Sequence, residues 1–206
     1  MPKILDGDKQ ILTSGYGPGL SNKQKTAVNI VQAPFQDVGQ VWGAGAVSTG
    51  PGNKCYRQTD KNTGMITTVL QIDLTGLAVK GDAAHDVIGL AAGGAAYIYR
   101  NVVADNGVIF KYEVSCIELP TQKTATITTD IDLTWNSNGT RNYDYGLGAE
   151  THNLATLVAG ETFTSADDTN LTGGHYLYLV EGDNSASTGV YSGGQYVFTF
   201  YGYPVR

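Results

Sequence analysis

The chain has 206 residues, of which 41% are hydrophobic and only 16% are charged, with 27 glycines and 13 tyrosines. This composition excludes a disordered polyelectrolyte, and the net charge of −6 argues against nucleic acid as the main partner, because an acidic surface repels phosphates. No apolar run approaches the ~20 residues of a membrane helix, and MPKILDGDKQ lacks the apolar core of a signal peptide. We therefore expect a chain that is made in a cytoplasm and enters no membrane.

Residues 1–62 contain little periodicity and are rich in turn-forming stretches such as GYGPGLSNKQK. Only AVNIVQA, residues 27–33, has the character of a strand. Residues 1–61 carry seven basic and four acidic side chains, a net charge of +3, whereas the rest of the chain carries −9. This difference is compatible with ordinary scatter of charge, but it also predicts an extended N-terminal arm that binds an acidic partner surface. The arm residues expected to bind are Lys3, Lys9, Lys23 and Lys25.

Residues 63–206 alternate between apolar and polar side chains, which predicts half-buried antiparallel strands. In MITTVLQIDL, alternate residues from Ile66 to Leu74 share one apolar face. The Asn-Gly pair at 106–107 predicts a hairpin between AAYIYRNVV and VIFKYEV. The strand that contains the second stretch, VIFKYEVSCIE, is expected to face the core with Val108, Phe110, Tyr112, Val114 and Cys116.

The later strands are TATITTDIDLTW, HYLYLVE and GQYVFTFYGY. In the first of them, Asp130 and Asp132 are expected on an exposed polar face. HNLATLVAG, residues 152–160, has room for two helical turns, but no apolar stripe of helical period reaches twelve residues. The sequence therefore predicts an all-β body of the jelly-roll or β-sandwich type over residues 63–206, with less than about a tenth of the residues in helix.

The stretch GDAAHDVIGLAAGGAAYIYR, residues 81–100, combines a histidine, two aspartates and four glycines. It is no phosphate-binding loop, because no lysine follows the glycines and a strand follows them in place of a helix. Its small residues instead predict close approach of backbones. His85 beside Asp86 has no nucleophile motif to serve, so we expect a solvated loop histidine.

Other candidate sites are weak by the same reasoning. Asp130 and Asp132 lie about 7 Å apart on one strand face, a spacing that a glycoside hydrolase can use, although solubility explains the pair more simply. DGD at 6–8 and ADDTN at 166–170 resemble only fragments of a calcium loop. Cys55 and Cys116 form no metal-binding spacing. We predict no catalytic residue, no metal and no cofactor.

Tyrosine and phenylalanine crowd the last thirty residues. Such aromatic side chains build sheet cores, protein interfaces and sugar-binding platforms. The residues expected to form an aromatic interface are Tyr176, Tyr178, Tyr196, Tyr201 and Tyr203.

The run ITTVLQIDLTGLAVKGDAAHDVIGLAAGGAAYIYR, residues 66–100, and the β-rich remainder resemble a family of small virion structural proteins of tailed bacteriophages. The resemblance covers roughly residues 65–206. It lies in the general character of the sequence and includes no catalytic motif, so it carries over no functional residue. It implies a decoration or cement protein on the outside of a capsid, made in the host cytoplasm, with the major capsid protein as partner.

We therefore expect a non-enzymatic protein that stabilises a capsid shell through its arm and a homo-oligomeric β body, as a trimer. The alternative is a receptor-binding or carbohydrate-binding module of a phage fibre or tail, which would use the aromatic residues near the C-terminus. A third class is a hydrolase acting through Asp130 and Asp132.

Overall fold

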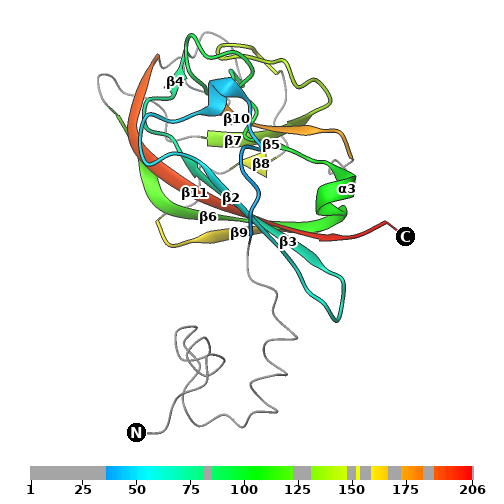
Figure 1. Cartoon of the computed structure of the whole chain (residues 1–206). Coiled ribbons are helices and arrows are strands. Elements are labelled where there is room, and N and C mark those ends of the chain that lie inside the picture. The colour runs from blue at the N-terminus through cyan, green and yellow to red at the C-terminus, as the bar shows by residue number, and fades with distance from the viewer. Residues whose placement is uncertain are drawn as a thin grey trace, which may run out of the picture.

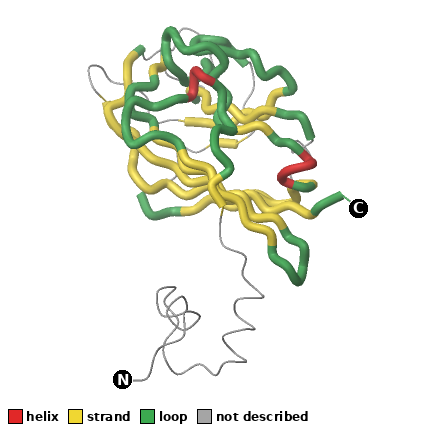
Figure 2. The backbone as a smooth tube through the Cα atoms, viewed as in Figure 1, coloured by secondary structure: helices red, strands yellow, loops and turns green. Residues whose placement is uncertain are grey.

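The computed structural model describes residues 36–205 except for 81–84, 123–130, 148–151, 154–158, 167–172 and 183–187. The structure is mostly β, and helix accounts for 5% of it. This confirms the predicted all-β class and the predicted limit on helix. Two antiparallel sheets stack into a sandwich, with the large sheet below the small one in Figures 1 and 2.

The large sheet has the strand order β1-β2-β3-β11-β6-β9, and β4 (Ala78–Val79) pairs with one end of β11. The strands of this sheet are β1 (Gln36–Asp37), β2 (Lys54–Thr59), β3 (Ile66–Asp73), β6 (Val108–Gln122), β9 (Thr162–Ala166) and β11 (Gly189–Tyr203). β11 is the central strand, because it pairs with β3 on one side and β6 on the other.

The small sheet has the order β5-β10-β7-β8. Its strands are β5 (Tyr99–Arg100), β10 (Tyr176–Glu181), β7 (Ile131–Asn136) and β8 (His152–Asn153). Two short helical segments lie between strands: η1 (Ala44–Ala46) precedes β2, and α3 (Val103–Asn106) joins β5 to β6. β8 occupies the start of HNLATLVAG, a stretch with room for two helical turns; residues 154–158 of it lie outside the described residues.

The strand order is that of a jelly roll. Eight strands remain when the short β4 and the two strands before β3 are set aside. They alternate between the sheets along the chain, except that the fourth and fifth, β7 and β8, both lie in the small sheet. The first, eighth, third and sixth of these strands lie side by side in the large sheet, and the second, seventh, fourth and fifth in the small sheet. This arrangement is the double Greek key of a jelly roll.

The predicted alternation holds along β3 and β11. In β3, Ile66, Leu70 and Ile72 are buried while Thr67 and Val69 are half-buried on the outer face. In β11, alternate residues from Tyr196 to Gly202 are buried. A period of two therefore identified both strands and their inner faces correctly.

The predicted inner face of β6 is correct for Tyr112, Val114 and Cys116 but wrong for Val108 and Phe110. The pairing with β11 shifts by one residue between Lys111 and Ile109, which makes Phe110 the extra residue of a β-bulge. A bulge reverses the alternation, so Ile109 is buried in place of its neighbours.

The hairpin predicted at the Asn-Gly pair is wrong. β5 pairs with β10 in the small sheet, whereas β6 pairs with β11 and β9 in the large one. Asn106 ends α3, and Gly107 follows with a φ of 70°. A side chain at Gly107 would also meet the carbonyl of Tyr203 at 2.3 Å, so glycine is required where the chain crosses between sheets.

The Gly/Ala stretch of residues 89–96 packs backbone to backbone against η1. The amide of Gly45 donates to the carbonyl of Ala95, and the amide of Leu90 donates to the carbonyl of Gly45. A Cβ at Gly45 would lie 2.2 Å from the carbonyl oxygen of Gly94. This confirms that small residues here serve close approach.

The boundary expected after residue 62 does not coincide with the start of the sandwich. β2 pairs with β3 over six residues, and Cys55 is buried in the core. The sheet therefore begins at Gln36. The remaining part of the predicted arm, residues 1–35 with its expected strand at 27–33, lies outside the described residues.

An aromatic cluster joins the two sheets. Phe200 of β11 stacks on Tyr99 of β5 with ring centroids 4.3 Å apart and planes 8° from parallel. Trp135 of β7 meets Phe200 edge-on at 6.2 Å, and Tyr112 of β6 lies at 6.0 Å. Each of these pairs adds to the burial of large apolar area.

We predict that Phe200→Ala destabilises the protein by about 3–5 kcal/mol, because it removes a buried ring and leaves a cavity between the sheets. Chemical denaturation of both proteins measures the difference. Leu119→Ala, at an exposed position of β6, is the control and should change the free energy of unfolding by less than about 0.5 kcal/mol. Equal effects of the two substitutions would contradict this account of the core.

Both cysteines are free and buried. Cys55 on β2 and Cys116 on β6 are separated by β3 and β11, which places them about 14 Å apart across three strand spacings. That distance excludes a disulfide between them. Burial raises the pKa of Cys55 to about 12 and also raises the pKa of Cys116.

We predict that neither thiol reacts with a thiol reagent in the folded protein at neutral pH. Burial keeps the reagent away from the sulfur atoms, and the raised pKa values keep the thiols protonated. In denaturant, two thiols per chain should react rapidly. A native protein that reacts at one thiol as fast as the denatured chain would contradict the burial of that cysteine.

Candidate functional site

The five tyrosines expected to form one aromatic interface lie in three different places. Tyr176 and Tyr178 belong to β10 of the small sheet. Tyr196 is buried between the sheets. Tyr201 and Tyr203 lie on the outer face of the large sheet, because the residues between and before them point inward. The four lysines expected to bind a partner, Lys3, Lys9, Lys23 and Lys25, lie outside the described residues.

Tyr176 is part of an aromatic group on the outer side of the small sheet. Its ring meets that of Tyr97 edge-on at 4.9 Å, and the guanidinium of Arg100 lies 5.6 Å from its centroid. Gly139 packs against the outer end of the ring, where a Cβ would come within 2.4 Å. Tyr178 is buried and donates to the carbonyl of Asn138. These contacts cover Tyr176, so the group is a packed cluster and offers a sugar little open ring surface.

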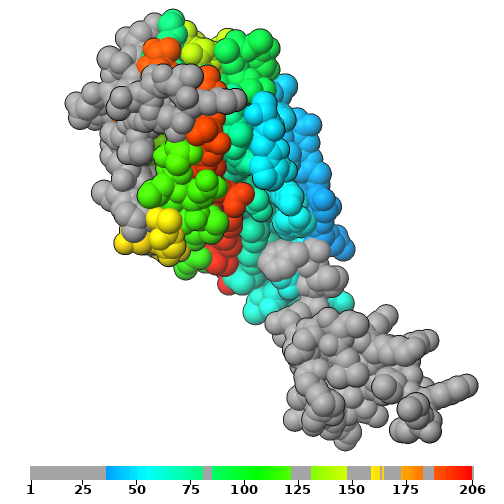
Figure 3. Space-filling view, turned by 90° about the vertical axis from the view of Figure 1, so that its left-hand side faces the viewer, coloured from blue at the N-terminus to red at the C-terminus, as the bar shows by residue number. Residues whose placement is uncertain are grey.

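The opposite face of the molecule is the outer face of the large sheet, seen in Figure 3 as bands of β9, β6, β11, β3 and β2. At the α3 end of this face, Phe110 stacks on Tyr203 with centroids 5.0 Å apart. Val108 pairs with Tyr203 across the strands, and Val205 follows two residues later. We call these four residues the end patch; their exposed fractions are 55% for Val108, 41% for Phe110, 49% for Tyr203 and 67% for Val205.

A polar group borders the end patch on the same face. The carboxylate of Glu113 accepts from Lys111 Nζ at 2.7 Å and from the Tyr201 hydroxyl at 2.8 Å. The Lys111 ammonium also lies 5.1 Å from the centre of the Tyr201 ring. These hydrogen bonds, first that of Lys111 and then that of Tyr201, lower the pKa of Glu113. Burial and the same carboxylate raise the pKa of Tyr201 to about 12.

Ile117 and Leu119 are also exposed, at 51% and 42%. Together with the end patch they account for six of the eight large hydrophobic side chains exposed in the described part of the chain. All six lie on β6 or at and beyond the end of β11. Scattered apolar side chains are normal on a protein surface, but a concentration on one pair of strands indicates a contact surface.

Sequence reasoning missed this surface. Val108 and Phe110 were assigned to the core because the pattern of apolar and polar residues in β6 does not reveal the bulge. Ile117 and Leu119 carried a readable signal, since they share the phase of Lys111, Glu113 and Ser115, the polar side of the predicted strand. Apolar residues on a polar face point to an interface.

The expectations for His85 and Asp132 are wrong. Only 5% of His85 is exposed, and Asp132 is completely buried. Nδ1 of His85 lies 4.0 Å from Oδ2 of Asp132. Asp132 pairs with Val180 of β10, and Val180 pairs on its other edge with Val87. From beside that added edge, the His85 side chain reaches Asp132 on the face of the small sheet.

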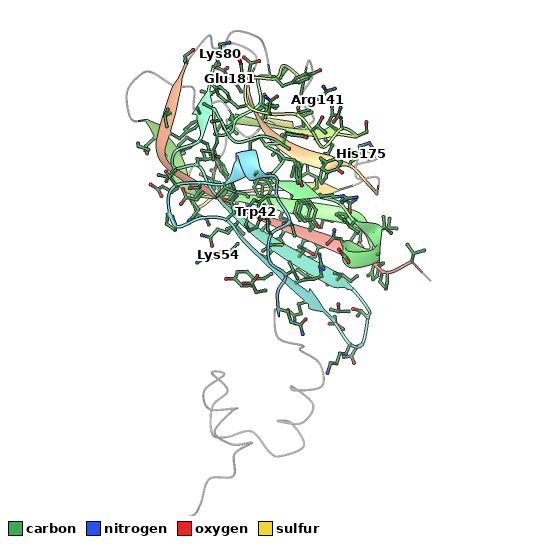
Figure 4. All side chains as sticks on the ribbon, turned by 45° about the horizontal axis from the view of Figure 1, so that its top comes forward. Trp42, Lys54, Lys80, Arg141, His175 and Glu181 are labelled. Carbon is green, nitrogen blue, oxygen red and sulfur yellow. The ribbon has the colours of Figure 1, made fainter. Side chains whose placement is uncertain are left out.

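Further buried polar groups lie at this end of the sandwich. Asp86 and Glu181 are 1% and 0% exposed, and the amide of Glu181 donates to the carbonyl of Asp86. Figure 4 shows Glu181 and Lys80 at this end, and Lys80 pairs with Asp144 at 2.8 Å. Figure 4 also shows Trp42 beside η1, where it packs against the core.

The burial of these groups favours a structural role over a catalytic one, because a substrate can reach a completely buried carboxylate only if the protein opens locally. Asp130, the second member of the proposed carboxylate pair, lies outside the described residues, as do DGD and most of ADDTN. Among the described residues, no group of three histidine, cysteine, aspartate or glutamate side chains has the arrangement of a metal site.

None of the helices in the described ranges combines the length and apolar character needed to cross a membrane. Comparison of the chain with protein-family models, with curated proteins and with solved structures found no match.

We predict that Glu113→Gln destabilises the protein at pH 7 by about 0.5–1 kcal/mol, as expected for a partly exposed ion pair. A carboxyl with a lowered pKa in the fold adds stability above its unfolded pKa of about 4.3. That stability is lost as the pH falls through the lowered, folded value. Denaturation of wild type and variant across this pH range measures the difference, with Glu118→Gln as control. A difference that grows as the pH falls would contradict the assignment.

Proposed function

We propose that this protein is a non-enzymatic structural component of a virion, which decorates and stabilises the outside of a tailed-phage capsid as a homotrimer. Its partner is the major capsid protein. The observation that carries the proposal is the concentration of exposed apolar side chains on β6 and the end of β11. This surface is suited to contact with another protein.

The architecture supports the proposal without deciding it. Jelly rolls build viral capsid proteins, but they also build lectins and enzymes of the cupin type. Two features favour the structural role. The exposed apolar residues sit on a rigid sheet, which presents them in a fixed geometry. His85, Asp86, Asp132 and Glu181 are buried, which disfavours a hydrolase that acts through Asp132.

The carbohydrate-binding alternative has weaker support. It needs exposed ring faces, and the ring of Tyr176 is packed against Tyr97, Arg100 and Gly139. Tyr145 remains 39% exposed, but Arg141 stacks on it at 3.9 Å.

We assign the Ile117–Leu119 pair to the contact with the shell, together with the basic residues Lys3, Lys9, Lys23 and Lys25 of the N-terminal segment. Apolar contacts resist salt, whereas exposed ion pairs contribute at most about 1 kcal/mol each and weaken as the ionic strength rises. Because the copies act together in a trimer, small contributions of each arm add through multivalency.

The test is add-back of the full-length protein to particles of its own phage, stripped of the native copy. Wild type should rebind and restore resistance of the particles to heat. The double variant Ile117→Asp and Leu119→Asp should lose at least about tenfold in affinity, since two exposed aliphatic side chains no longer become buried. Replacing the four lysines by glutamine should flatten the dependence on salt.

Val47→Asp, which changes another exposed apolar residue away from β6, is the matched control and should rebind as wild type does. The proposal fails if the protein is absent from purified particles by mass spectrometry. It also fails if wild type does not rebind, or if the double variant and the control rebind equally.

A further inference from the structure

The end patch has no assigned role in the contact with the shell, and its position suggests one. It lies where β6 begins and β11 ends, next to α3. Phe110 and Tyr203 stack on one another, so the patch is ordered and apolar. Val108 and Val205 are the two most exposed of the eight exposed large hydrophobic side chains in the described part of the chain.

The N-terminal end of β1, at Gln36, points toward the same end of the sheet. β1 runs antiparallel to β2 with Gln36 opposite Arg57. In the adjoining strands this row continues through Thr68 and Phe200 to Tyr112. Tyr203 lies three residues beyond Phe200, about 10 Å further in the direction of residue 35.

The end patch and β1 are nevertheless separated in the direction across the strands. β2 and β3 lie between β1 and β11, so the patch begins about 14 Å across the sheet, at the usual spacing of strands. The face between them carries polar side chains such as Gln58 and Thr67. The patch and the exit of the N-terminal segment are thus two different surfaces at one end of the molecule.

The size of the patch fits an extended segment better than the rigid face of another protein. A stable interface between folded surfaces buries about 800 Å² on each partner, far more than four side chains provide. Residues 27–33, AVNIVQA, contain Val28, Ile30 and Val31, and seven extended residues span about 23 Å. Such a segment matches the patch in chemistry and is long enough to cover it.

A homotrimer also requires a contact between unlike surfaces. A patch that binds its own copy gives a two-fold dimer, whereas a segment of one copy that binds a patch on the next gives a closed ring. The exit of the segment and the end patch, displaced across the sheet, provide two such unlike surfaces.

We propose that the end patch of each copy binds residues 27–33 of a neighbouring copy, so that exchanged N-terminal segments hold the trimer together. This inference rests on the trimer of the proposed function but not on its contact with the shell. Val28 and Ile30, which share one face of an extended segment, are buried in this contact against Phe110 and Tyr203. The basic residues that precede them remain available for the shell.

The test uses full-length variants and light scattering in solution. Wild type should have three times the monomer mass of 21.8 kDa. Phe110→Asp, which spoils the patch, and Ile30→Asp, which spoils the segment, should each weaken association by about tenfold or more and yield monomers at low concentration. Leu119→Asp, on the same strand but outside the end patch, is the matched control and should remain trimeric.

Mixing the two monomeric variants makes the test specific. The Phe110→Asp variant keeps an intact segment and the Ile30→Asp variant keeps an intact patch. The mixture should therefore form a heterodimer with twice the monomer mass. These cannot close into a ring. A variant carrying both substitutions should not form dimers with itself. Circular dichroism and thermal unfolding of each variant establish that the sandwich is intact.

Three results would overturn the inference. Wild type that is monomeric in solution shows that the patch has another occupant, such as the shell or the segment of the same copy. A Phe110→Asp variant that stays trimeric shows that the trimer uses another surface. Two monomeric variants that fail to associate when mixed show that no segment is exchanged. None of these results affects rebinding of Ile117 and Leu119 to particles, so failure here differs from failure of the shell proposal.

Discussion

The sandwich depends on the aromatic contact between Phe200 and Tyr99. One ring comes from the central strand of the large sheet and the other from an edge strand of the small sheet, and they stack at 4.3 Å. Because Trp135 and Tyr112 close around the same ring, both sheets are held in register by one cluster. Burial of such rings provides much of the free energy that offsets the ordering of so many loops.

The inner and outer faces of a strand were predicted best where the strand pairs in a regular register. β3 and β11 alternate as simple half-buried strands do, and their inner faces were identified correctly. β6 departs from that rule at Phe110, because the bulge depends on how two strands align, a property of the pair. The Asn-Gly pair at 106–107 was misread for a similar reason: glycine with a positive φ suits both a hairpin and the end of a helix.

The candidate surface was only partly accessible to sequence reasoning. Ile117 and Leu119 are apolar residues at positions that belong to the polar face of their strand, so the sequence alone can identify them. Val108 and Tyr203 become neighbours only through long-range strand pairing. Asp132 was misassigned because alternation predicts two faces but not what covers them. His85, far away in the sequence, reaches that face, where its ring lies 4.0 Å from the buried Asp132 carboxylate. The two ends of the sandwich consequently differ: one buries polar groups, and the other exposes apolar ones.

The position of β11 in the strand order has a consequence for biosynthesis. The strand that fills the centre of the large sheet follows all the other described strands, and its partners β3 and β6 have no direct contact with each other in that sheet. Until the ribosome has released residues 189–203, Leu70 and Val114 lack the strand that completes their face of the core. Such non-local pairing folds slowly and leaves strand edges open meanwhile. A translation product that stops before β11 is therefore no shortened version of the protein but a substrate for chaperones and proteases.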